Sequence, residues 1–193
     1  MKPDVLTRWL GAARRERVLR VLLSDYVLNG ASCAFGMFVV SAIVHLLFGA
    51  EAAANATVGV IAALAPDLVG PRRGKLVHLV VAPLIGVPLF LAVQLLRGHP
   101  VGLGLFLVPA TFLAFLGMAW GKRGAPVAIG VMLVMLFSMS TPLAASPGQA
   151  LVRTFYCGLG CALYVVYALV AHTVLNARYR TQLTADLLLA VAA

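Results

Sequence analysis

The positions of the positive charges constrain this chain more than any other feature of its sequence. Long apolar runs fill most of the 193 residues, and lysine and arginine are confined to the short breaks between these runs. The breaks alternate along the chain between strongly basic and hardly basic. This alternation is typical of a protein that crosses a membrane several times, because cytoplasmic loops are enriched in lysine and arginine.

The composition also favours a membrane protein. Hydrophobic residues make up 62% of the chain and charged residues 11%, whereas soluble domains carry roughly 25% charged residues. A net charge of +9 would suggest nucleic-acid binding in a soluble protein. Here the basic residues lie beside apolar segments, where topology and anionic lipid headgroups account for them. We therefore expect the lipid bilayer, and no nucleic acid, as a partner.

We predict an all-α polytopic membrane protein with six transmembrane helices, preceded over residues 1–24 by an amphipathic, basic helix at the membrane surface. The membrane domain covers residues 25–175. Residues 176–193 are expected to begin a cytoplasmic helix, as in a fragment of a longer protein. The six spans are predicted at about 26–48, 52–69, 76–96, 100–120, 125–143 and 154–175. With these spans, 13 of the 15 lysine and arginine residues fall on one side, so both termini are predicted to be cytoplasmic.

The second predicted span, at 52–69, is rich in alanine and is the weakest of the six by hydropathy. If it did not cross, the basic segment Pro71-Arg72-Arg73-Gly74-Lys75 would lie outside the cell and every later loop would be inverted. Because that segment is strongly basic, a full crossing is favoured.

Residue types that carry chemistry are sparse. The cysteines, Cys33, Cys157 and Cys161, all lie in apolar runs and imply no disulfide framework, so we interpret them as small packing residues. The four histidines lie on separate segments, and the sequence has no nucleophile with a base, no metal-ligand spacing and no phosphate-binding loop. We therefore expect no enzymatic activity, no metal and no cofactor.

Polar residues follow one face of the first span. Asp25, Asn29, Ser32 and Gly36 are spaced so that they share a helical face, which turns from polar to small towards the middle of the membrane. Such a stripe suits a water-filled path, with Asn29 and Ser32 contacting a substrate and Asp25 as a gating or proton-coupling group. It suits equally a tight helix contact, with Asp25 at headgroup level paired with an arginine.

Two further ionisable groups are candidates for gating or proton coupling. Asp67 ends the second span shortly before Arg72 and Arg73, so it forms either an interfacial ion pair or a gate. His78 lies within the third span and could carry a proton.

Arg97 and Arg153 break the charge asymmetry, because both fall on the side that otherwise lacks cations. Arg153 stands just inside the sixth span, with Tyr156 on nearly the same face. A guanidinium that faces a cavity would bind carboxylates with two parallel hydrogen bonds, which predicts a substrate site at Arg153 and Tyr156. The alternative is an arginine that extends to the outer headgroups.

Two short motifs carry a family resemblance. The loop after the fourth span reads Met118-Ala119-Trp120-Gly121-Lys122-Arg123-Gly124-Ala125-Pro126, and the second span ends Pro66-Asp67-Leu68-Val69-Gly70-Pro71-Arg72-Arg73. Together with the basic N-terminus, they resemble the N-terminal membrane domain of the fusaric acid resistance (FUSC) family over about residues 15–190. The chain also looks distantly similar to the plant aluminium-activated malate transporters.

The resemblance implies a bacterial inner-membrane protein that exports aromatic or other organic carboxylic acids. It also implies a homodimer, or a pairing with a second six-helix half. Five cations would line the cytoplasmic mouth for the anionic substrate: Arg72, Arg73, Lys75, Lys122 and Arg123. Positive-inside topology predicts the same five residues. A passive organic-anion channel and a structural membrane domain without transport remain the alternatives.

Overall fold

The computed structural model describes residues 25–67 and 72–192, and helices are the only regular elements in this part of the chain. The helices are α2 (Asp25–Phe48), α3 (Ala50–Leu64), α4 (Arg72–Leu96), α5 (Pro100–Gly117), the 3-10 helix η1 (Met118–Arg123), α6 (Gly124–Ser140) and α7 (Pro147–Ala192). The predicted all-α fold is therefore confirmed. The surface helix predicted over residues 1–24 lies outside the described residues.

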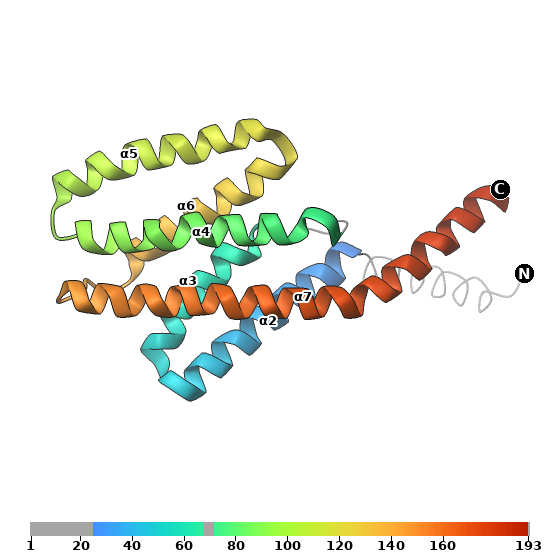
Figure 1. The fold of residues 1–193 in the computed structure, drawn as a ribbon, viewed down its shortest axis with the longest axis horizontal. Coiled ribbons are helices and arrows are strands. Elements are labelled where there is room, and N and C mark those ends of the chain that lie inside the picture. The colour runs from blue at the N-terminus through green and yellow to red at the C-terminus, as the bar shows by residue number, and fades with distance from the viewer. Residues whose placement is uncertain (1–24, 68–71, 193) are drawn as a thin grey trace, which may run out of the picture.

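Consecutive α-helices run in alternating directions between two ends of the bundle (Figure 1). One end, called here the basic end, holds the start of α2, the turn at 65–67, the start of α4 and η1. The other, called the outer end, holds Gly49 and the connections at 97–99 and 141–146. The chain thus passes between the two ends six times from α2 to α7, as the alternating charges predict.

The six helices are not equally long. Four contain stretches that are long and apolar enough to span a membrane, within α2, α4, α5 and α7. The helix α3 has 15 residues and α6 has 17. At 1.5 Å per residue, α3 is about 22 Å long, which is less than the ~30 Å hydrocarbon core of a bilayer. The second span is therefore shorter than the predicted 52–69 because its helix gives way to a turn at Ala65 and Pro66.

The final helix begins earlier than predicted and continues further. Ser146 caps its N-terminus by accepting a hydrogen bond from the Gln149 main-chain N–H at 3.2 Å, and Pro147 stands at the first helical position. Both are preferred helix-start residues. From there α7 runs without interruption to Ala192, so no break separates the predicted sixth span from the segment at 176–193.

The centre of the bundle is α3, which packs against α2, α4, α6 and α7. Nine of its fifteen residues are buried, most of them alanine, glycine or valine. Its closest approach is to α7, where Gly59 lies against the main chain of Cys157 and Gly160 lies against that of Ala56. A Cβ atom on either glycine would overlap the facing helix, so small residues are required on both sides of this contact.

Two glycines turn the chain at opposite ends of the bundle. Gly121 has φ 72° and ψ −144°, a conformation that other residues rarely adopt, and it reverses the direction of the chain between α5 and α6. Gly49, with φ 88°, does the same between α2 and α3. Because the 3-10 helix η1 with Gly121 follows α5, the fourth span ends at Gly117, three residues before its predicted end.

Candidate functional site

A buried carboxylate organises the polar side chains at the basic end of the bundle. Asp67 is 8% exposed. Its Oδ2 accepts a hydrogen bond from the Tyr164 hydroxyl at 3.0 Å and a weaker one from the Cys33 thiol at 3.7 Å. Its main-chain carbonyl accepts a hydrogen bond from the Asn29 side-chain amide at 3.1 Å. We call Asp67, Tyr164, Cys33 and Asn29 the Asp67 cluster; it joins α2, the turn that follows α3, and α7.

The rest of the predicted polar face of α2 meets α7 beside this cluster. The Tyr167 hydroxyl donates to the Ser32 main-chain carbonyl at 2.9 Å and lies 3.3 Å from the Ser32 hydroxyl. Gly36 admits the Tyr167 ring, because a Cβ atom there would overlap it. Asn29, Ser32 and Gly36 therefore do share a face, and in this structure that face forms a tight helix contact.

The sequence interpretation missed three members of this region. Cys33 was assigned to packing alone, and neither Tyr164 nor Tyr167 was singled out. The signal available for the tyrosines was their spacing of three residues within an apolar run. A buried tyrosine needs a hydrogen-bond partner for its hydroxyl, so two on one helical face indicate a polar region opposite.

At the outer end, Arg153 is bound within the protein. Its side chain is 6% exposed, whereas that of Glu51, its partner, is 68% exposed. Nε and Nη2 donate to the Glu51 carboxylate at 3.2 and 3.0 Å, and Nη1 donates to the Pro142 carbonyl. Tyr156 packs on Phe48, with ring centroids 5.5 Å apart. The four predicted substrate-binding residues thus fall in two places, Asn29 and Ser32 near the basic end, Arg153 and Tyr156 near the outer end.

The Arg97 side chain is likewise bound within the protein. Its guanidinium donates to the main-chain carbonyls of Ser138 and Thr141, at the end of α6. The buried Gln94 amide donates to the same Ser138 carbonyl at 3.0 Å. The last carbonyls of a helix have no partners within it, so a nearby cation can satisfy them. Both arginines that break the charge asymmetry therefore bind the chain between Ser138 and Pro142.

Seven predicted site residues are placed by their main chain alone, since their side chains are not described. Asp25 begins α2. Arg72, Arg73, Lys75 and His78 lie in the first two turns of α4, and Lys122 and Arg123 end η1. All seven stand towards the basic end, and their predicted roles remain predictions. Among the described residues, no three His, Cys, Asp or Glu side chains gather where they could hold a metal ion.

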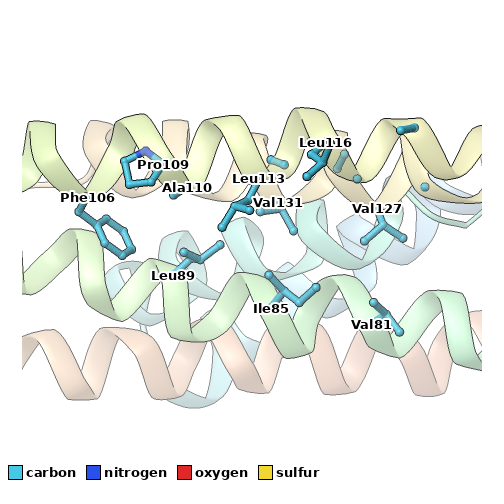
Figure 2. Close-up of a pocket in the computed structure, with 15 residues that line it drawn as sticks. Val81, Ile85, Leu89, Phe106, Pro109, Ala110, Leu113, Leu116, Val127 and Val131 are labelled. Carbon is cyan, nitrogen blue, oxygen red and sulfur yellow. The ribbon is translucent and has the colours of Figure 1, made fainter.

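A long apolar groove of about 1030 Å³ lies between α4, α5 and α6, and Figure 2 shows the side chains that surround it. Ile85 and Leu89 line it from α4, Ala110 and Leu113 from α5, and Val131 from α6. None of the fifteen residues that line it has a polar side chain. The groove is therefore separate in place and in chemistry from the Asp67 cluster.

Comparison with known proteins decides the family. The profile of the family described as "FUSC-like inner membrane protein yccS" matches residues 84–193, more than half of the chain. The chain belongs to this FUSC-like family. No curated protein and no solved structure matches it.

Membership makes this FUSC-like chain a multi-pass inner-membrane protein with a transport-related function. The matched residues run from the middle of α4 to the end of the chain, so they include Arg97, Arg153, Tyr164 and every residue that lines the groove except Val81. Asp67 and the polar face of α2 precede them. The family match therefore covers one side of the Asp67 cluster.

Proposed function

We propose that this chain is a membrane transport domain that exports aromatic or other organic carboxylic acids across the inner membrane of a bacterium. The observation that carries the proposal is the burial of Asp67 beside the Tyr164 hydroxyl at the basic end. Burying an ionisable group within a membrane domain is costly, and such groups mark substrate and proton pathways. The role is one of transport and not of enzymatic catalysis.

The basic end suits the collection of anions. Arg72, Arg73, Lys75, Lys122 and Arg123 all lie there along the main chain, and a surface of one charge raises the local concentration of oppositely charged substrates. Positive-inside topology accounts for these cations as well, so the proposal depends on the Asp67 cluster and not on them.

Asp67 is suited to proton coupling because its carboxyl group links α7 to the turn that follows α3. An ionised carboxylate accepts the hydrogen bonds of Tyr164 and Cys33, whereas a protonated one becomes a donor and loses acceptor capacity. Protonation of Asp67 would weaken the bond to Tyr164 and loosen the contact between α7 and the end of α3. Separation of the helices here would open a path for substrate beside Asn29 and Ser32.

Arg153 would act at the outer end. Its guanidinium is already bound by one carboxylate, that of Glu51, which is itself largely exposed. A substrate carboxylate could take the place of Glu51, with Tyr156 beside the aromatic part of the molecule. In this proposal Arg153→Ala weakens transport of an aromatic acid, and unchanged transport removes Arg153 from the site.

The test is efflux of 4-hydroxybenzoate from proteoliposomes that contain the chain, with and without an imposed proton gradient. We expect Asp67→Asn to reduce gradient-driven efflux by about a hundredfold or more, the usual effect of losing a positioned proton-transfer group. Asp67→Glu retains a carboxylate and should retain dependence on the gradient. Thr111→Val, on α5, serves as the control and should behave as the unmodified chain does.

Two results would replace the proposal. Equal flux of the unmodified chain with and without the gradient would assign it to a passive organic-anion channel. No flux of any aromatic acid would favour a structural membrane domain without transport. A second copy of the chain, or a second six-helix half, is the proposed partner, and cysteine cross-linking in native membranes tests that pairing.

A further inference from the structure

The groove between α4, α5 and α6 is a site in its own right. The helix α5 packs on α6 and η1 but hardly on α4, although α4 and α5 are consecutive in the chain. The space that remains measures about 1030 Å³, which is at the upper end of the range of small-molecule sites. Leu89, Phe106 and Leu113 extend into it from the two helices (Figure 2).

The chemistry and shape of the groove define its occupant. Its lining is apolar throughout, so nothing there could satisfy the carboxylate of an organic acid or an ordered water. It extends along α5 from Phe106 to Gly117 and on to Ala119 of η1, a length of about 20 Å at 1.5 Å per residue. One leaflet is about 20 Å deep with its headgroup region, of which about 15 Å is hydrocarbon. A long, apolar occupant that belongs to one leaflet fits these dimensions.

The charges at one end of the groove specify the occupant further. Ala119 and Gly124, which line the groove, flank the segment that carries Lys122 and Arg123. This is the basic, cytoplasmic end of the bundle, and the cytoplasmic leaflet is the one that displays anionic lipids. We propose that the groove binds one acyl chain of an anionic phospholipid from the cytoplasmic leaflet, with the lipid phosphate at the Lys122–Arg123 end of η1.

The test measures lipid bound to the purified full chain by native mass spectrometry. Palmitoyl-oleoyl phosphatidylglycerol is compared with phosphatidylcholine of the same acyl chains. We expect one phosphatidylglycerol per chain and about a thirtyfold preference over phosphatidylcholine, as two cations near an anionic headgroup supply. The double variant Lys122→Gln, Arg123→Gln should bind both lipids equally, because it leaves the apolar groove intact and removes the two positive charges beside it.

Filling the groove separates a specific site from general adhesion of lipid. Ala110→Trp places a large ring in the groove and should reduce retained phosphatidylglycerol about tenfold, because several methylene contacts are lost. Ala114→Phe is a second, smaller filling variant in case the first does not fold. Val108→Trp is the matched control, since Val108 lies on the same helix but outside the groove and is 73% exposed.

The proposal fails if Ala110→Trp and Val108→Trp retain lipid equally, or if the unmodified chain does not distinguish the two headgroups. It also fails if the groove holds a different occupant. A dimer that Ala110→Trp dissociates would assign the groove to a second copy of the chain. Displacement of phosphatidylglycerol by excess 4-hydroxybenzoate would assign it to the binding of an aromatic acid. Because the readout is bound lipid, these results are independent of whether the chain transports an acid.

Discussion

The helices α3 and α5 differ in a way that is specific to proteins in a bilayer. The helix α3 is short, rich in alanine and the weakest span by hydropathy, yet nine of its fifteen residues are buried and four helices pack around it. The helix α5 is almost wholly apolar, yet none of its eighteen residues, all of them described, is buried. Lipid tails are as apolar as leucine, so an apolar side chain has no reason to leave them. Helices pack where small residues let their main chains approach.

The largest effect is expected where the two main chains meet. Gly160→Leu would drive a side chain into the main chain of Ala56 on α3. We expect a loss of about 3 kcal/mol in unfolding free energy, since overpacking against a rigid main chain cannot be relieved by rotamer changes. The matched variant on α5 is Gly104→Leu, where nothing lies within 4 Å of the added Cβ. Thermal unfolding in the same detergent compares them, and equal losses would contradict the contrast between the two helices.

A smaller effect is expected from the polar contact at the outer end of the same pair of helices. Arg153→Gln removes the hydrogen bonds to Glu51 and to the Pro142 carbonyl. We expect a loss of about 2 kcal/mol, the range of hydrogen bonds to charged groups. Glu51→Gln should cost less, because the Glu51 side chain is largely exposed and water can replace its contacts. Equal destabilisation by the two variants would show that the ion pair, and not the arginine's contact with the loop, carries the effect.

Arg97 allows the same reasoning to be checked on the side of the bundle where α4 meets α6. Arg97→Met retains the length of the side chain but leaves the Ser138 and Thr141 carbonyls without this donor. Because the buried Gln94 amide still binds Ser138 and Thr141, we expect a loss of only about 1 kcal/mol. Faster hydrogen exchange at residues 141–146 would locate the effect in the outer connection. A chain that fails to insert would instead indicate a role in topology.

The smallest effects are expected from trimming single apolar side chains. Val60→Ala, in the centre of α3, removes two methyl groups from a fully buried site and should cost about 1 kcal/mol through lost packing. Leu105→Ala, on the lipid face of α5 where Leu105 is 78% exposed, should change stability by less than about 0.5 kcal/mol. If Leu105→Ala proves the more damaging of the two, the face of α5 that carries Leu105 is covered by protein and not by lipid.

Much of the fold could be predicted from the charge pattern and the lengths of the apolar runs, and part of the site could not. The alternation of basic breaks predicted that the doubtful second span crosses, and α3 does run from one end of the bundle to the other. Spacing alone placed Asn29, Ser32 and Gly36 on one face of α2. The partners of that face could not be predicted, because Tyr164 and Tyr167 come from a helix more than 130 residues further along the chain. Asp67 was a candidate from its position, but its bond to Tyr164 depends on how α3 and α7 cross.

The sequence by itself predicted how many times the chain passes between the two ends and which end is basic. The cost of exposing peptide groups to lipid and the distribution of lysine and arginine are properties of each segment alone. Only the tertiary structure decided that a weak helix lies at the centre, that Arg97 and Arg153 bind the loop between α6 and α7, and that α5 leaves a groove beside α4. In a bilayer, helices pack according to how well their surfaces fit and not according to their hydrophobicity. That fit depends on two segments at once, so neither segment's sequence shows it alone.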